Sequence, residues 1–472
     1  MPGFAAYRLR QEKGLKRGVM SKKNEIQNPI TEGVIWQQLL LFFFPILFGT
    51  FFQQLYNAAD AMIVGRFVGK EALSAVGGST GMLTQMIVGF FVGLSSGASV
   101  IISQYYGAKR PEMVGYAVHT AVAFSVVSGL VMTAVGIPLA PFMLTAMGTP
   151  EDVVGLSVEY LRIYFAGMVA NLIYNTGAAI LRAVGDSKRP LHILMFSCLI
   201  NIALDILLVV MCGLGVKGAA IATILSQLLS AVLVCICLMR AQDMYRLEWK
   251  QVRLDQRMLK RIVRIGFPAG LQSVMYGSSN VIIQAGINSL GTNTVAAWAA
   301  YSKIDAVFWM MVNSFGIAIT TFVGQNYGAG KTERVHKGVR SCMKMTIVSS
   351  ALMSVLIYNW GIYAYELFTT DKEVISIGID MMRYLSRFYV TYVAIEILSG
   401  ALRGVGDCWI PMMLCCVGVC ALRVGWILIA VPLDRNIFTI MFSYPLTWVI
   451  TTILFAVYYL KYSRLKVRRK NS

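Results

Sequence analysis

The sequence predicts an all-α polytopic membrane protein, with twelve transmembrane helices in two six-helix lobes that are related by a parallel internal repeat. Composition, apolar stretches and internal repetition predict this fold class. The 472 residues are 57% hydrophobic and only 14% charged, with a mean hydropathy of +0.64. This is far more apolar than a typical soluble protein of the same length, so the chain is expected to lie in a membrane.

Apolar stretches recur from end to end of the chain. Each has about 18 residues or more, which as a helix can cross a hydrocarbon core of roughly 30 Å. A transmembrane β-barrel needs alternating segments of about ten residues, and the sequence has none. The twelve predicted helices cover approximately residues 34–64, 72–105, 111–147, 152–181, 190–212, 216–239, 265–289, 294–326, 337–368, 375–402, 411–432 and 436–461.

The two halves of the chain repeat each other. The segment LRAVGDSKRP (181–190) returns as LRGVGDCWIP (402–411). At the same offset in the numbering, QYYGAKRPEMV (104–114) returns as QNYGAGKTERV (325–335). Because each copy has an even number of spans, the second copy enters the membrane from the same side as the first. The copies are therefore parallel repeats, and in such folds the substrate path lies between or within the halves.

The repeat also sets the predicted domain boundaries. Phe44 and Pro45 return as Phe267 and Pro268, so the first helices of the two copies align with only a short gap relative to the later motifs. We expect five segments: a cytoplasmic amino-terminal tail (1–33, with 1–19 as a disordered extension or a misassigned start before Met20), an amino-terminal six-helix lobe (34–240), a basic cytoplasmic linker (241–258), a carboxy-terminal six-helix lobe (259–463) and a basic cytoplasmic tail (464–472).

The formal net charge of +19 is concentrated on one side of the predicted membrane. Most of the 42 Lys and Arg lie in the tails and the even-numbered connections, whereas the opposite connections hold only Arg66, Lys70, Lys217, Lys372 and Arg435. With both termini in the cytoplasm, this asymmetry follows the positive-inside rule. A nucleic-acid-binding module is absent from the sequence, so the basic loops are expected to meet anionic membrane lipids and not nucleic acid.

Signals of enzyme chemistry are absent from the sequence. The nine cysteines mostly lie in apolar stretches, and His119, His192 and His336 lack a metal-ligand spacing. The segment GQNYGAGKT (324–332) departs from the Walker A spacing and follows a predicted membrane helix. A membrane enzyme would need a nucleophile with a base, or a metal constellation, and none is visible. We therefore expect no enzyme activity, no bound metal cofactor and no ATP-driven transport.

Two acids inside apolar stretches are the strongest functional candidates. Ionised carboxylates at the bilayer centre cost roughly 2.5 kcal/mol or more, so an acid placed there indicates a function. Asp60 stands near the end of the first predicted helix, and Asp205 lies in the fifth within CLINIALDILLVV. Asn201 precedes Asp205 by four residues, on the same helical face. Low polarity disfavours a charged carboxylate, so such a group can load and release a proton.

The alternative is that these acids only bond neighbouring backbone or reach the lipid headgroups. The repeat provides an internal comparison, because Asp60 aligns with Ile283 and Asp205 aligns with Trp426. Acids needed only for folding would be expected in both copies. The asymmetry predicts that the amino-terminal lobe handles the ion.

Several ordered motifs give the chain a family resemblance. They are P…QQLYNAADAMIVG in the first predicted helix, followed by GAKRPEMV, LRAVGDSKRP, NIALD, GFPAGLQ and GQNYGAGK. Across residues 34–463 the sequence resembles the multidrug and toxic compound extrusion (MATE) transporters. The resemblance implies a bacterial cell-membrane antiporter that exports lipophilic organic cations in exchange for H⁺ or Na⁺, and we expect a monomer.

A related lipid-linked precursor flippase is the alternative within the same superfamily. Its cavity is expected to carry Arg and Lys for a pyrophosphate group. The basic residues within predicted spans are few: Arg162, Lys303, Arg383, Arg387 and Arg423. The favoured function is therefore cation-coupled efflux.

The resemblance also implies roles for individual residues. The predicted proton- or cation-coupling residues are Asp60, Asn201, Asp205 and Thr223, of which the first three form a candidate Na⁺ site. The predicted substrate or secondary polar contacts are Gln53, Tyr160, Asn175, Gln284 and Glu396. Pro45 is expected to bend the first helix, because proline removes a backbone hydrogen bond there. The seventh predicted helix has no acid, which argues against a sodium site in the second lobe.

Overall fold

The computed structural model describes residues 28–463 and 465, and its regular structure within these residues is entirely helical. The amino-terminal half contains α2 (Pro29–Glu32), α3 (Ile35–Phe67), α4 (Lys70–Gly77), α5 (Ser79–Gly107), α6 (Pro111–Ala146), α7 (Glu151–Ala166), α8 (Met168–Ala183), α9 (Lys188–Asp205), the π-helix η1 (Ile206–Met211) and α10 (Gly215–Met239). The predicted all-α membrane fold is confirmed in this half, where long apolar helices follow one another.

The carboxy-terminal half follows a short connection that holds the 3₁₀ turn η2 (Trp249–Gln251). Its helices are α11 (Gln256–Asn288), α12 (Thr292–Gly328), α13 (Thr332–Glu366), α14 (Lys372–Ser386), α15 (Tyr389–Gly404), α16 (Trp409–Cys415), the π-helix η3 (Cys416–Ala421), α17 (Leu422–Leu433) and α18 (Ile437–Lys461). The element order of the first half thus recurs in the second.

The predicted count of twelve membrane helices is not confirmed. Within the described residues, nine helices are long and apolar enough to cross a membrane, and two bent pairs raise the number to eleven. The helix that falls short is α11, which is 33 residues long but starts with several basic residues and carries polar ones along its length. The predicted seventh span therefore exists as a helix without the apolar character of the others.

Two of the predicted helices are broken. The predicted helix 152–181 consists of α7 and α8, and the predicted helix 375–402 consists of α14 and α15; each pair bends by 53°. The break in the first pair falls at Gly167, where a Cβ atom would overlap the side chain of Ile224 on α10. A glycine is therefore required where α10 crosses the joint. These bends occupy equivalent places in the two halves.

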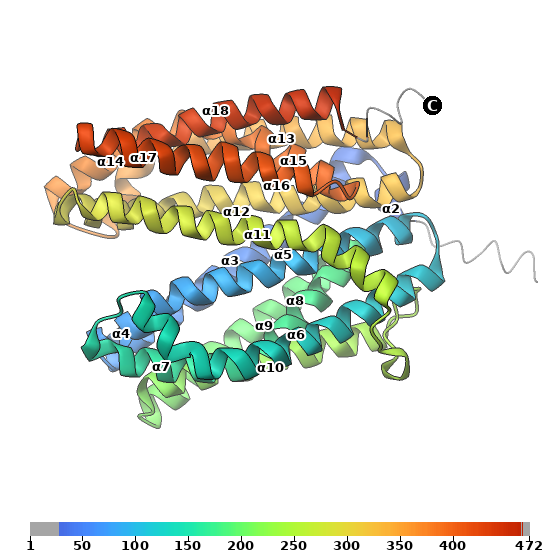
Figure 1. Cartoon of the computed structure of the whole chain (residues 1–472), viewed down its shortest axis with the longest axis horizontal. Coiled ribbons are helices and arrows are strands. Elements are labelled where there is room, and N and C mark those ends of the chain that lie inside the picture. The colour runs from blue at the N-terminus through green and yellow to red at the C-terminus, as the bar shows by residue number, and fades with distance from the viewer. Residues whose placement is uncertain (1–27, 464, 466–472) are drawn as a thin grey trace, which may run out of the picture.

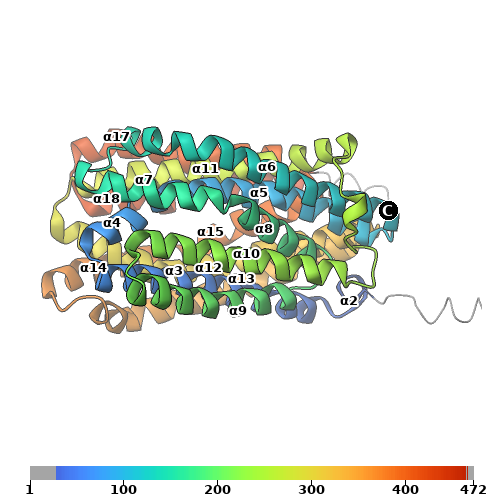
Figure 2. The same ribbon diagram turned by 90° about the horizontal axis from the view of Figure 1, so that it is seen from below.

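The helices run along one long axis, as Figures 1 and 2 show from two sides. In Figure 1, α11 to α18 form the upper layer and α3 to α10 the lower one. The layers lie close together at the end that carries the carboxy terminus and α2, and diverge towards the opposite end. We call the end that carries the carboxy terminus and α2 the terminal end.

Close contact between α5 and α11 joins the two halves. A Cβ atom on Gly93 or Gly97 of α5 would overlap the backbone of α11 at Gly270 and Gly266. A Cβ atom on either of these two α11 glycines would likewise overlap the backbone of α5. Small residues at four-residue spacing let two membrane helices approach until their backbones touch. This glycine contact lies in the part of each helix that leads to the terminal end.

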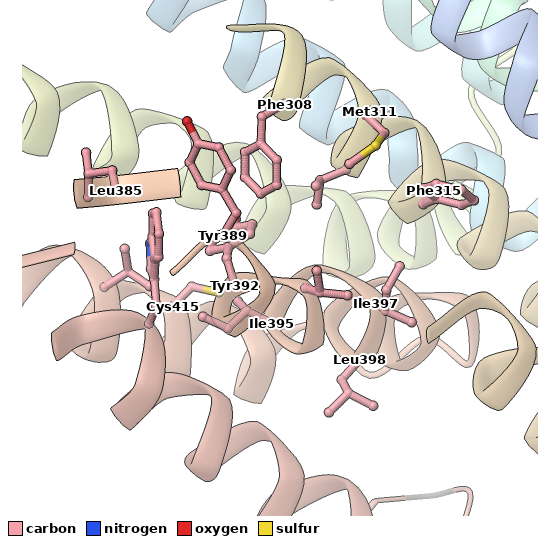
Figure 3. Packing of buried hydrophobic residues seen from close by; sticks show 14 of the residues in the cluster. Phe308, Met311, Phe315, Leu385, Tyr389, Tyr392, Ile395, Ile397, Leu398 and Cys415 are labelled. Carbon is pink, nitrogen blue, oxygen red and sulfur yellow. The ribbon is translucent and has the colours of Figure 1, made fainter. Parts of the chain in front are cut away.

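The largest apolar cluster fills the carboxy-terminal half. Figure 3 shows part of it, with Phe308 and Met311 of α12 facing Tyr389 and Tyr392 of α15. The rings of Phe308 and Tyr389 stack with centroids 4.0 Å apart. The amino-terminal half has several smaller clusters in its place. The two halves therefore share a helical order and differ in how their interiors are filled.

Candidate functional site

The four predicted coupling residues meet inside the amino-terminal half. Asp60 comes from α3, Asn201 and Asp205 from α9, and Thr223 from α10. Their exposed fractions are 5%, 1%, 0% and 3%, so all four are buried. The Thr223 hydroxyl donates a hydrogen bond to Asp60 Oδ2 over 3.2 Å and is itself anchored on the α10 backbone at Ala219. We call these four residues the acid centre.

Much of the hydrogen-bonding capacity of the acid centre is unused. Asp60 Oδ1, both carboxylate oxygens of Asp205 and both polar atoms of the Asn201 amide are buried without a hydrogen-bond partner among the described residues. Buried polar atoms are nearly always paired in native proteins, and each exception calls for an explanation. Five such atoms lie together here, and they make the acid centre the candidate site for a proton or a cation.

The electrostatics of the acid centre are those of two neighbouring acids. Asp60 interacts with Asp205, Asn201 and Thr223, and none of these is basic. Among the described residues, no Lys or Arg forms an ion pair with either carboxyl group. Two adjacent carboxylates repel when both are ionised, so the centre can hold one positive charge or one proton between them.

The donor set also suits a hard cation. Carboxylate and amide oxygens of Asp60, Asn201 and Asp205 are ligands of the kind that such cations take, so the residues fit the predicted Na⁺ site. Within the described part of the chain, no group of three or more His, Cys, Asp or Glu could hold a metal ion.

Local sequence explains why the acids point inward. Four-residue spacing places Asn201 and Asp205 on one face of α9, and both are buried. Directly after Asp205 the helix widens into the π-helix η1. Single π-turns inside α-helices are frequent at functional sites because they redirect the residues around them. The change of helix type begins at the second acid of the centre.

A polar cavity adjoins the acid centre and shares Asn201 with it. Tyr56, Asn201 and Gln227 all line it, and Tyr56 and Gln227 stand four residues from Asp60 and Thr223 on their own helices. The directions of α3, α9 and α10 put this cavity on the terminal side of the acids. Its empty space is about 420 Å³, counted with the part that opens to the surroundings. The lining residues are Gln53, Tyr56, Asn171, Tyr174, Asn175, Leu194, Ser197, Cys198, Asn201, Ser226, Gln227 and Ser230.

The predicted secondary contacts divide between the halves. Gln53 and Asn175 line the cavity, and Asn175 donates to the backbone and side chain of Asn171. Tyr160 of α7 is buried beside Asp60. The structure thus places these three predicted residues around the acid centre.

Gln284 and Glu396 lie elsewhere. Gln284 belongs to α11 and donates to Asn288 of the same helix over 2.8 Å. Glu396 belongs to α15 and faces Gly316 of α12 in the carboxy-terminal half. The structure does not bring either residue to the acid centre. Pro45 lies inside α3, which continues through it as one helix, so the predicted bend stays a prediction.

Sequence reasoning missed several residues of the cavity. Tyr56, Asn171, Tyr174 and Gln227 are among them. A signal for two of them was present, because Tyr56 and Gln227 lie four residues from Asp60 and Thr223 and so share their helical faces. Asn171 carried the same signal, since it lies four residues before the predicted Asn175 on α8.

Comparison with known proteins identifies the family of the chain. The MatE family model matches residues 45–207 and 268–427, one match in each half of the chain. The chain belongs to the MATE family. It is therefore a multi-pass membrane transporter and not an enzyme, and the family named from the sequence motifs is confirmed.

Curated relatives of this MATE protein come from bacteria. The probable multidrug resistance protein YoeA of Bacillus subtilis is 27% identical over 433 residues, covering 90% of this chain and 93% of the relative. The probable multidrug resistance protein NorM of Thermotoga maritima is 25% identical over 395 residues, covering 82% and 84%. A FAD transporter of Shewanella oneidensis is 24% identical over 324 residues, covering 68% and 71%.

A solved structure shares the fold of this MATE protein. It is described as the outward-facing conformation of a multidrug resistance MATE family transporter of the MOP superfamily. The TM-score is 0.87 at 23% sequence identity, and the match covers 94% of this chain and 99% of that one. At this identity the likeness supports the fold alone.

Proposed function

We propose that this MATE protein is a secondary antiporter that exports lipophilic cationic small molecules in exchange for H⁺, or Na⁺, with Asp60 and Asp205 as the coupling carboxylates. The observation that carries the proposal is the acid centre, where two buried carboxyl groups interact without a basic partner. The bacterial multidrug resistance relatives support the substrate class.

Exchange follows from competition for one negative charge. An ionised centre attracts an organic cation, because a buried charge without a partner is costly and a cation removes that cost. When a proton or Na⁺ enters from the outside, it neutralises the same charge and the organic cation loses its counter-charge. Loading one ligand therefore releases the other, which is the requirement for antiport.

The cavity supplies the route to this charge. Its polar lining is uncharged, and Asn201 belongs both to the cavity and to the acid centre. A cation that enters from the terminal end would pass along amide, hydroxyl and aromatic groups before it meets a carboxylate. Alternating access by movement of the two halves would then open the acid centre to the opposite side. We place the terminal end in the cytoplasm, as the positive-inside rule predicts.

The cavity does not favour the flippase alternative. A pyrophosphate group would need Lys or Arg in the binding site, and no lining residue is basic. Arg423 is buried in the other half, over the ring of Tyr444, at 4.0 Å from its centroid. The charge of the cavity lining thus fits an organic cation better than a lipid-linked diphosphate.

Dye accumulation in cells tests the substrate class. Cells that express the protein should hold a fluorescent cationic dye at a lower level than cells without it. Asp60→Asn and Asp205→Asn should each abolish this difference at unchanged protein level in the membrane, whereas Asp305→Asn, a carboxyl already bonded by Trp309 and Tyr389, should keep most of it. Undiminished export by both acid-centre variants would overturn the assignment.

A further inference from the structure

Two glutamines bond across the halves in a reciprocal pattern. Gln104, at the end of α5, donates from Nε2 to the Gly404 carbonyl of α15 over 2.8 Å. Gln325, at the end of α12, donates from Nε2 to the Ala183 carbonyl of α8 over 2.7 Å. The two glutamines occupy equivalent positions of the internal repeat, and so do their two acceptors. Each half therefore gives one donor and one acceptor, related by the repeat.

Two glycines hold the helices of these glutamines in contact. A Cβ atom on Gly107 would overlap the backbone carbonyl of Gln325, and a Cβ atom on Gly328 would overlap that of Gln104. These glycines are also equivalent positions of the repeat. The ends of α5 and α12 thus cross with their backbones touching, and only glycine allows it.

The acceptors are carbonyl groups that their own helices cannot satisfy. Ala183 and Gly404 are the last residues of α8 and α15, and the last four carbonyls of a helix have no partner within it. Gln325 is completely buried, with an exposed fraction of 0%. Each bond therefore completes a helix end of the opposite half, and separating the halves would leave buried groups unpaired.

One of the bonded helices, α8, also lines the cavity. α8 carries Asn171 and Asn175 of the cavity and bends from α7 at Gly167. Gln325 thus holds one end of α8, and the bend lies at the other end. A change at the bond is transmitted to the cavity through a single helix of 16 residues.

We propose that Gln104 and Gln325 are paired gating residues, which hold the terminal end closed and release it when the transporter opens to that side. The proposal rests on the alternating access described under the proposed function. It assigns a role in transport to two residues outside the acid centre and the cavity. Opening to the terminal end breaks both bonds together, because each glutamine lies in one half and its acceptor in the other.

Gln325 is held by more hydrogen bonds than Gln104. The Asn28 amide donates to Gln325 Oε1 over 2.9 Å, while Asn28 Oδ1 accepts from the backbone of Ile30 at the start of α2. Gln325 is thus held at both ends of its amide. Gln325→Ala, which loses both bonds, should therefore open the gate further than Gln104→Ala.

Hydrogen–deuterium exchange of the full-length protein in detergent tests the gate without a substrate. Gln104→Glu and Gln325→Glu keep the side-chain shape and remove the donor. Each should speed exchange of the amides at the ends of α8 and α15 by about fivefold, the factor expected from one lost hydrogen bond. Amides of α4, at the opposite end, should be unchanged. Gln37→Glu, an exposed glutamine near the start of α3, is the matched control and should have no effect.

A second pair of variants tests the crossing. Gly107→Ala and Gly328→Ala should raise exchange at the same helix ends, because the added methyl group separates the backbones. Gly115→Ala is the control, since a Cβ atom there meets nothing within 4 Å. Unchanged exchange at α8 and α15 in all four gate variants would overturn the proposal. Dye export by the wild-type protein is measured in parallel. If the variants show the expected faster exchange but the wild-type protein does not export the dye, the proposed function is contradicted and the gate proposal still holds.

Discussion

The amino-terminal and carboxy-terminal halves use the same helical order to enclose different interiors. Gln227 lines the cavity of the first half, and its counterpart in the repeat, Trp448, is 1% exposed within the aromatic core of the second. Asn171 likewise lines the cavity, whereas its counterpart Tyr392 packs against Trp448 with centroids 5.7 Å apart. Positions that are polar around a cavity in one half are aromatic and close-packed in the other.

The acid centre shows the same contrast. Asp60 aligns with Ile283, which is buried among apolar residues. Asp205 aligns with Trp426, whose indole N–H is satisfied by the Thr439 carbonyl over 2.8 Å. At these two positions the first half keeps buried carboxylate oxygens without partners, whereas the second half has an apolar side chain at one and a hydrogen-bonded indole at the other. A duplicated scaffold can therefore place ion handling in one copy and let the other serve as a packed counterpart.

Exchanging the residues at the acid position should give the largest effects. Asp60→Ile should abolish dye export and leave stability equal or higher, because an apolar side chain replaces a buried acid with an unsatisfied oxygen. Ile283→Asp should destabilise the protein by several kcal/mol, because it places a charge among buried apolar side chains. Thermal unfolding in detergent and dye export measure the two outcomes. Equal loss of stability in both variants would remove the distinction between the halves.

Exchanging the residues at the cavity position should give the next largest effects. Trp448→Gln should lower stability by about 3–5 kcal/mol, the usual cost of removing a large buried aromatic side chain. Gln227→Trp should fill the cavity and lower export about tenfold while the fold remains intact. Unfolding curves and transport rates measure these changes. Export at the wild-type rate in Gln227→Trp would show that the cavity is not on the substrate route.

The Thr223 hydroxyl should give the smallest effect. Thr223→Val removes the hydrogen bond to Asp60 Oδ2 and should change the transport rate by about three- to tenfold, as expected for the loss of one ordinary hydrogen bond. Thr50→Val is the control, because Thr50 bonds only the backbone of its own helix at Ile46. A pH profile of transport should shift in the first variant and stay in place in the second.

Much of the fold could be predicted from the sequence because its signals are local. Apolar length predicts spans, and the two GVGD motifs reveal the repeat. The count of twelve membrane helices is not confirmed, for two physical reasons. The helix α11 is too polar along its length to qualify as a span, and the breaks at Gly167 and near Phe388 depend on tertiary contacts that no local pattern encodes.

The acid centre was predictable for similar reasons, and the cavity only in part. Asp60 and Asp205 stand out because acids are rare in apolar stretches, and Asn201 shares a helical face with Asp205. Gln284 and Glu396 were predicted from the resemblance as polar residues in apolar helices, and this says nothing about the helix face they occupy. The gating glutamines could not be found because their motifs look like ordinary turns, and their bonds join helices that are distant in sequence.

Proteoliposomes test the central claim that the acid centre couples an ion to substrate movement. Purified protein is reconstituted with a cationic dye, and a pH gradient is imposed without sodium. The account predicts dye movement that depends on the gradient, is lost in Asp60→Asn and Asp205→Asn, and persists in Asp305→Asn. Movement that requires sodium alone would replace H⁺ by Na⁺ as the coupling ion. Gradient-driven movement that persists in both acid-centre variants would contradict the account.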